Sequence, residues 1–153
     1  MTRAPARPGK PGTYGVVAIK GRRYYDLGFS TYYPVQGKAG RGKKGGPAEE
    51  DLYTYHAEVT RVVDGDSFYA HIALGFGIVL EARLRLRALN ADELPTRAGI
   101  RAKKALEGLL TGRRKQVLIK TAKSDQYGRY LADVWVGGKD ITTELLQAGL
   151  TLR

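Results

Sequence analysis

The segment IVLEARLRLRALN, residues 78–90, alternates between apolar and polar side chains over most of its length. One set of alternating positions holds Leu80, Ala82, Leu84, Leu86 and Ala88, and the other holds Arg83, Arg85 and Arg87. A period of two is that of a β-strand, because successive side chains point to opposite faces. The sequence therefore predicts a long strand over 78–90 with an apolar side and a cationic side.

Other segments extend this strand into a fold. Residues 55–63, 67–74, 115–122 and 130–137 favour strands. Residues 96–110 carry an apolar stripe at helical spacing behind the N-cap residue Thr96, with Gly112 after its end, and residues 141–149 predict a second, short helix closed by a glycine. Five strands with a helix after the third follow the plan of an OB-type barrel. We therefore expect an α+β, mainly β fold, a five-stranded OB-type barrel with two helices.

The N-terminal third differs in composition from this barrel region. Residues 1–13 are rich in Pro, Gly and Arg and predict a disordered tail. Residues 14–34 predict a small β-hairpin, and residues 35–51 a Gly/Lys-rich linker. The main domain is then expected over 52–153. Tyrosines beside arginines in the hairpin suit base stacking, and they suit packing onto a neighbouring strand equally well.

The charge of the chain limits its partners. The net charge is +11, of which residues 1–50 contribute +7 (ten basic and three acidic residues). A chain this basic favours polyanions, nucleic acid above all. The absence of cysteine excludes disulfides and thiolate chemistry, and two histidines make a histidine-built zinc site unexpected. With no secretory signal and no apolar stretch long enough to span a membrane, we expect no membrane partner and a cytoplasmic location by default.

Polar residues gather where the predicted strands end. Asp64 and Asp66 lie in the VVDGDS turn, and Asn90, Asp92 and Glu93 follow the long strand. Carboxylate and carbonyl oxygens are the ligands that Ca²⁺ prefers. Arg85 and Arg129 could hold a phosphate from two sides, and a glutamate can deprotonate a water. Each piece alone has a plainer interpretation, since Asp-Gly is a common hairpin turn and strand arginines are usually solvated.

The ordered set resembles the staphylococcal nuclease family. Three motifs carry the resemblance, VVDGDS (62–67), RLRALNADE (85–93) and YGRYLA (127–132), within about residues 55–150. The resemblance implies an OB barrel and Ca²⁺-dependent cleavage of DNA and RNA at the 5′-oxygen–phosphorus bond. By position, it implies metal-site roles for Asp66, Asp64, Asn90 and the Ala91 carbonyl, phosphate clamps at Arg85 and Arg129, a water-activating Glu93, and a substrate-side Tyr127.

The sequence departs from the family pattern at two points. Asn90 stands where the family usually has a second carboxylate, which predicts weaker Ca²⁺ binding unless Asp92 restores the charge. We also expect the family's third, C-terminal helix to be absent. Residues 1–50 have no counterpart in the family pattern. Either these residues or a partner could cover the part of the core that the third helix covers in the family.

Three functions follow as expectations. The first is a calcium-dependent nuclease that acts on DNA or RNA, with single strands as the expected substrate. The alternative is a non-catalytic OB-fold module that binds nucleic acid or protein without cutting. The third is a basic structural protein of a larger nucleoprotein particle. The retention of Asp66, Arg85, Glu93 and Arg129 together favours the nuclease, because degenerate domains usually lose several such positions at once.

Overall fold

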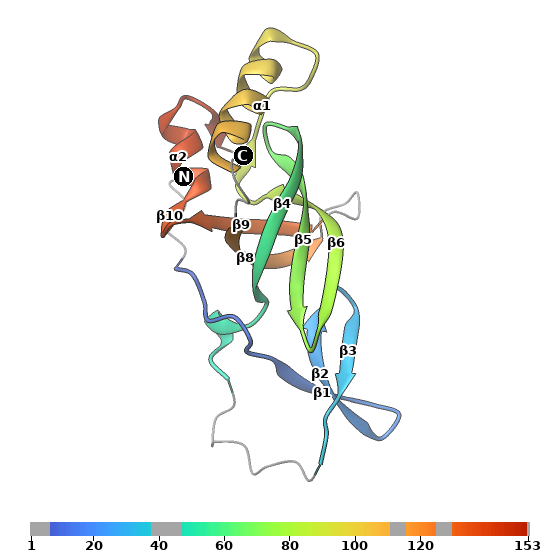
Figure 1. The fold of residues 1–153 in the computed structure, drawn as a ribbon. Coiled ribbons are helices and arrows are strands. Elements are labelled where there is room, and N and C mark those ends of the chain that lie inside the picture. The colour runs from blue at the N-terminus through green and yellow to red at the C-terminus, as the bar shows by residue number, and fades with distance from the viewer. Residues whose placement is uncertain (1–6, 38–46, 111–115, 125–129, 153) are drawn as a thin grey trace.

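The structure is a computed structural model that describes residues 7–37, 47–110, 116–124 and 130–152. Figure 1 shows a β-barrel with its two helices at one end and a small N-terminal sheet at the other. No helix in the described ranges is long and apolar enough to cross a membrane.

The barrel is built from β4 (Thr54–Asp64), β5 (Ser67–Gly75), β6 (Ile78–Leu86), β8 (Gln116–Ser124) and β9 (Tyr130–Val136). The first three strands form an antiparallel meander. β6 pairs with β9 in parallel, and β8 pairs with both β4 and β9, which closes the barrel. The two-residue β10 (Lys139–Asp140) extends β9. This arrangement confirms the predicted OB-type fold.

The core lies inside the barrel and beneath the helices α1 (Arg97–Leu110) and α2 (Ile141–Gln147). Every second residue of β5 points inward and is fully buried, and the helices add their own apolar faces. Thr96 caps α1 as predicted, because its Oγ1 accepts a hydrogen bond from the Gly99 N–H. Asp140 caps α2 in the same way through the Thr142 N–H. The fully buried members include Phe68, Ala70, Ile72, Leu74, Leu84, Leu86, Leu106, Leu110 and Leu145.

The long strand predicted over 78–90 is interrupted. β6 ends at Leu86, and Ala88 adopts a left-handed φ of 63° before the two-residue β7 (Leu89–Asn90). The prediction of one continuous strand was therefore wrong at its end, because the chain turns to place β7 beside β11 (Thr151–Leu152). Arg85 was also expected on a polar face, yet the segment after β6 folds over it and leaves it only 4% exposed.

The N-terminal segment has three strands in place of a two-stranded hairpin. They are β1 (Gly15–Ile19), β2 (Arg22–Gly28) and β3 (Thr31–Pro34), and a short 3₁₀ helix, η1 (Glu49–Asp51), precedes β4. Leu27 is fully buried in the common core. The tip of the β5–β6 hairpin packs on this sheet, with the Phe76 ring stacked on Tyr33 at a centroid distance of 4.2 Å. Tyr14, Tyr25 and Tyr33 of this segment thus pack against the core.

Candidate active site

Two turns meet beside the first turns of α1. Asp66 lies in the turn from β4 to β5, and Asn90 and Ala91 follow β6. The backbone joins these turns, since the Leu86 N–H donates to the Asp66 carbonyl at 2.8 Å. Gly65 allows the close approach, because a Cβ atom there would lie 2.5 Å from the Cβ of Ala102 and 2.6 Å from that of Ala91. Steric crowding, and not a left-handed backbone conformation, therefore requires glycine at this position, because its φ is not positive.

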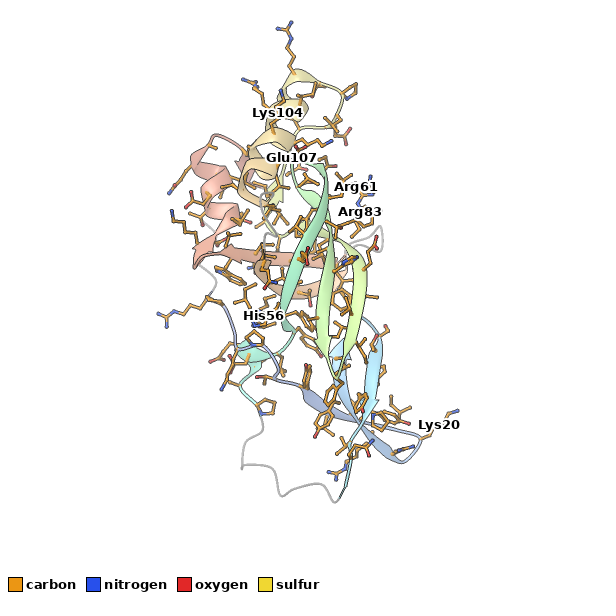
Figure 2. All side chains as sticks on the ribbon, in the orientation of Figure 1. Lys20, His56, Arg61, Arg83, Lys104 and Glu107 are labelled. Atoms are coloured by element: carbon orange, nitrogen blue, oxygen red, sulfur yellow. The ribbon has the colours of Figure 1, made fainter. Side chains whose placement is uncertain are left out.

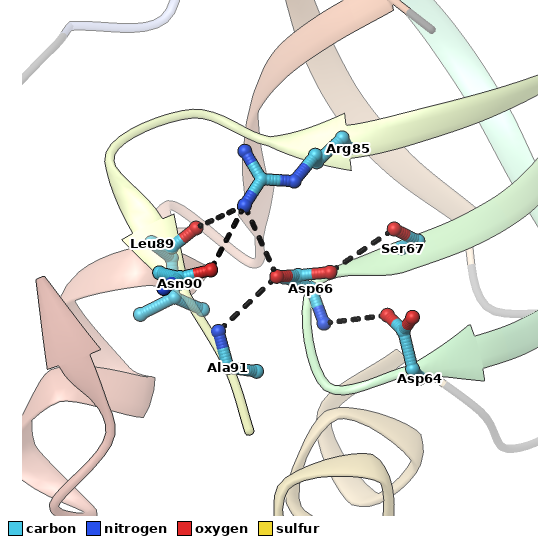
Figure 3. Close-up of polar contacts among 7 residues, drawn as sticks. All are labelled: Asp64, Asp66, Ser67, Arg85, Leu89, Asn90 and Ala91. Atoms are coloured by element: carbon cyan, nitrogen blue, oxygen red, sulfur yellow. Dashed lines mark hydrogen bonds and ion pairs between the residues drawn. The ribbon is translucent and has the colours of Figure 1, made fainter. Parts of the chain in front are cut away.

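Asp66 is the centre of the site (Figure 3). Its side chain is 9% exposed, and its Oδ2 accepts from Arg85 Nη2 at 3.3 Å and from the Ala91 N–H at 3.1 Å. Its Oδ1 accepts from the Ser67 hydroxyl at 3.1 Å. Both carboxylate oxygens are therefore held by donors, which fixes the orientation of the group.

Arg85 makes all these contacts through one nitrogen. Nη2 donates to Asp66, to the Leu89 carbonyl and to Asn90 Oδ1, each at 3.3 Å. Two protons shared among three acceptors at this distance give long, weak bonds. Within the described ranges Nη1 and Nε make no hydrogen bond, so one edge of the guanidinium is available to a ligand.

Asp64 stands next to Asp66 and binds its backbone. Its Oδ1 accepts from the Asp66 N–H at 3.1 Å. Burial raises the pKa of the Asp64 carboxyl above its usual value, and the neighbouring Asp66 carboxyl raises it further, while the positive charge of Arg83 lowers it. Burial beside a second carboxyl group thus favours the neutral form of Asp64.

The other predicted residues differ in how they relate to this centre. Ala91 points its N–H at Asp66, whereas its carbonyl was the predicted ligand. Glu93 is exposed, and its side chain makes no hydrogen bond or ion pair with the described residues. Its backbone carbonyl is held by Thr96, so the start of α1 fixes its place in the chain. Tyr127 and Arg129 lie outside the described residues.

The oxygen donors around Asp66 can be compared with the ligands that a calcium ion requires. The described residues contain no group of three or more His, Cys, Asp or Glu side chains that could hold a metal. They do bring together two carboxylates, of Asp64 and Asp66, and the amide oxygen of Asn90. A hard cation with about six to eight oxygen ligands would take its remaining ligands from backbone carbonyls and water. Because all three are hard oxygen donors gathered around one turn, their chemistry fits such a cation.

Sequence reasoning missed several contributors. Ser67 and the Leu89 carbonyl complete the hydrogen bonds around Asp66 and Arg85, and only the alternation of buried and exposed positions could have pointed to Ser67. A groove of about 670 Å³ lies elsewhere, between the N-terminal sheet and β8–β9. It is lined by aromatic side chains, among them Phe29, Tyr53 and Tyr130, and the predicted site residues that the structure describes do not line it.

Comparison with known families finds a match in the C-terminal part of the chain. Residues 84–152 match the family described as staphylococcal nuclease homologue. The range includes Arg85, Asn90, Ala91 and Glu93, and it begins after the turn that carries Asp64 and Asp66. The resemblance seen in the motifs is thereby confirmed over residues 84–152.

One known protein was also found to be similar. Protein ParB of Escherichia coli is 35% identical to this chain over 79 residues. The aligned part makes up 52% of this chain and 41% of that relative. The chain therefore spans less than half the length of the curated relative that it matches.

Proposed function

We propose that this protein is a calcium-dependent nuclease that hydrolyses phosphodiester bonds of DNA or RNA, with a single strand as substrate. The observation that carries the proposal is the contact of Asp66 with Arg85 at the junction of two turns, where Asp64 and Asn90 also lie. Anionic and cationic groups side by side are what a nuclease needs, because the metal ion and the phosphate that it binds carry opposite charges. The nuclease-type family match supports this conclusion.

The roles of the residues follow from their chemistry. Asp66, Asp64 and Asn90, with a backbone carbonyl at Ala91, would hold the ion. When bound, Ca²⁺ supplies positive charge that stabilises the additional negative charge of the transition state. Arg85 donates from its free edge to a phosphate oxygen, and Arg129 is proposed as the second clamp, with Tyr127 beside the substrate. Glu93, exposed to water, deprotonates or orients the attacking water molecule.

Cleavage at the 5′-oxygen–phosphorus bond has a defined outcome. Water adds to phosphorus, the bond to the 5′ oxygen breaks, and that oxygen leaves with a proton. The products are a 3′-phosphate and a 5′-hydroxyl, which end-group analysis distinguishes from the opposite polarity.

The decisive experiment compares cleavage with and without metal. Heat-denatured DNA is incubated with the full chain in Ca²⁺ and in EDTA, beside an Asp66→Asn variant purified in parallel to exclude a contaminating nuclease. Cleavage by the wild type in Ca²⁺ alone, and by the variant at a strongly reduced rate, is expected. Equal cleavage by both preparations, or none by the wild type, would refute the proposal.

The non-catalytic OB-fold module is the second candidate. One observation favours it: Arg85 already donates to Asp66 and Asn90, so the carboxylate has a cationic partner without a metal. A protein that binds the same DNA tightly in both Ca²⁺ and EDTA, and never cuts it, would be this module.

A further inference from the structure

A row of three side chains crosses the outer face of the barrel beside the candidate site. Arg61 on β4 is paired with Tyr69 on β5, and Tyr69 is paired with Arg83 on β6. The neighbouring residues of β5, Phe68 and Ala70, are fully buried, so Tyr69 points outward. We call Arg61, Tyr69 and Arg83 the arginine row. Figure 2 labels its two arginines, which lie close together on the same side of the barrel.

Arg61 is exposed, and its guanidinium lies over the ring of Tyr69. Its guanidinium carbon is 4.7 Å from the centroid of the Tyr69 ring. A cation–π contact of this kind uses the face of the guanidinium and leaves its N–H edges free. Arg61 makes no ion pair within the described part of the chain. Its charge is therefore oriented but not neutralised.

Arg83 is the only one of three neighbouring arginines that is left without a carboxylate contact among the described residues. Arg85 pairs with Asp66 and Arg87 pairs with Asp133. The Nε atom of Arg83 is buried and has no hydrogen-bond partner among the residues that the structure describes. A buried donor without a partner is unfavourable, so an acceptor brought by a ligand would satisfy it.

The row continues the site in one direction only. Arg83 and Arg85 are two residues apart on the same face of β6, which places them about 6.8 Å apart along the strand. The next row beyond contains Glu58, His71 and Glu81, and both carboxylates are exposed. Those carboxylates repel phosphate. A polyanion that passes Arg85 and Arg83 is thus directed across the strands toward Arg61.

We propose that the arginine row binds the phosphate backbone of single-stranded nucleic acid next to the phosphate held at Arg85. Arg83 contacts the adjacent phosphate through its guanidinium, and Tyr69 holds Arg61 in position to contact a further phosphate. The inference rests on the proposed function for the nature of the substrate. The arginine row is proposed to determine the affinity for the substrate, whereas Arg85 and Glu93 are proposed to determine the rate of cleavage.

The test measures binding without cleavage. The full chain is titrated into a fluorescein-labelled oligothymidylate of a dozen nucleotides in EDTA at several salt concentrations, and anisotropy reports the Kd. Arg61→Ala and Arg83→Gln should each raise Kd roughly tenfold at low salt. Each should also lower the slope of log K against log salt by about 0.7, because one phosphate contact is lost.

A matched control exists in the N-terminal sheet. Arg22 is exposed and also lies over a tyrosine, with its guanidinium carbon 5.9 Å from the Tyr24 ring centroid. Arg22→Ala removes the same charge and the same kind of ring contact, so the general attraction of a basic protein is equal in both variants. The proposal requires Arg22→Ala to bind almost as the wild type does. Equal losses for Arg22→Ala and Arg61→Ala would overturn it.

The Kd measurement also separates this inference from the proposed function. Circular dichroism and thermal melting of each variant exclude unfolding as a cause, and Arg83→Lys gives a second variant that keeps the charge. If the row variants lose affinity but the wild type never cuts, the binding surface stands and the nuclease fails. If the wild type cuts and the row variants bind and cut normally, the row is refuted and the nuclease stands.

Discussion

Two arginines at the end of β6 each contact a buried aspartate, but they do so differently. Arg87 places both Nε and Nη2 at 3.0 Å from Asp133 Oδ2. Arg85 uses one nitrogen for three acceptors at 3.3 Å, Asp66 Oδ2 among them. The first contact is short and doubled, which is typical of a structural pair. The second leaves most of the guanidinium uncommitted, as a ligand-binding group requires.

The difference predicts opposite effects of one substitution. Arg85→Lys keeps the charge near Asp66 but loses the planar fork, so turnover on single-stranded DNA should fall by about 10²–10³-fold while the melting temperature changes little. Arg87→Lys should lower the melting temperature and leave turnover near the wild-type value. Steady-state kinetics and thermal melting of both proteins give the comparison. Equal turnover in the two variants would remove Arg85 from the catalytic role.

Asn90 offers a second test at the residue scale. It is exposed, and its Oδ1 accepts from Arg85. Asn90→Asp keeps this acceptor and adds a negative charge beside Asp66, so Ca²⁺ should bind more tightly. Isothermal titration calorimetry with Ca²⁺ measures the change, and Asn90→Ala, which should weaken binding, is the control. A weaker affinity in the folded Asn90→Asp protein would show that the new carboxylate pairs with Arg85 and not with the ion.

Gly65 allows the turn between β4 and β5 to pack closely against α1. A Cβ atom at this position would meet the Cβ atoms of Ala102 in α1 and Ala91 after β7, neither of which can rotate away. Gly65→Ala should therefore push α1 from the barrel and cost about 1–3 kcal/mol of unfolding free energy. Gly108→Ala is the control, since nothing lies near its added Cβ and alanine favours the helix interior by up to about 1 kcal/mol. Urea denaturation of both should give changes of opposite sign.

Much of the barrel could be predicted because its strands and helix ends carry local sequence signals. Alternation predicted β6, and capping chemistry at Thr96 predicted the start of α1. The end of β6 could not be read in this way. Ala88 has no local signal for a left-handed φ, and β7 exists because it pairs with β11, which lies more than 60 residues away along the chain. The same turn buries Arg85, so its motif was predictable and its burial was not.

The site was predictable to the same extent. The spacing of the motifs named Asp66, Arg85 and Asn90, and the structure does bring these three into contact. The sequence could not show that the Ala91 N–H, and not the Ala91 carbonyl, faces Asp66, because either orientation fits the same sequence. Such a choice depends on the path of the whole segment between β6 and α1.

The N-terminal sheet shares one core with the barrel. Leu27 is fully buried, and its carbonyl accepts from the Tyr55 hydroxyl of β4 at 2.6 Å. The Tyr14 hydroxyl donates to the Leu74 carbonyl of β5 at the same distance. The sheet is thus fastened to the barrel at two strands.

This attachment predicts that a change in the N-terminal sheet destabilises the barrel. Leu27→Ala should lower the unfolding free energy by about 2–5 kcal/mol, and fluorescence of Trp135 in β9 should report a single transition at the lower denaturant concentration. Val16→Ala in the same sheet is the control, because Val16 is 51% exposed. A Leu27→Ala protein whose Trp135 transition is unchanged would mean that the sheet unfolds separately.

The last link between sheet and barrel depends on pH. The Tyr53 hydroxyl, at the start of the barrel region, donates to Asp26 Oδ2 of β2 at 2.6 Å. This hydrogen bond, with a smaller effect of burial, raises the pKa of Tyr53 from 10.0 to about 12. Between pH 10 and 12 the unfolded chain therefore loses the proton before the folded one does. The folded state then binds more protons, so its stability falls as pH rises through this range.

Tyr53→Phe isolates that dependence. Near neutral pH the free energy of unfolding of the variant should lie below that of the wild type. The expected difference is near the lower limit of the range of about 0.5–1.5 kcal/mol for a hydrogen bond, because this bond is solvent-exposed. The difference should shrink from pH 10 upward and be mostly lost at pH 12, where about half of the folded wild type has lost the proton as well. Tyr55, whose pKa burial also raises, remains in both proteins and cancels in the comparison. Urea denaturation of both proteins at about pH 8, 10, 11 and 12 measures the difference in unfolding free energy. A difference that stays constant across these pH values would show that the Tyr53 proton does not couple the sheet to the barrel.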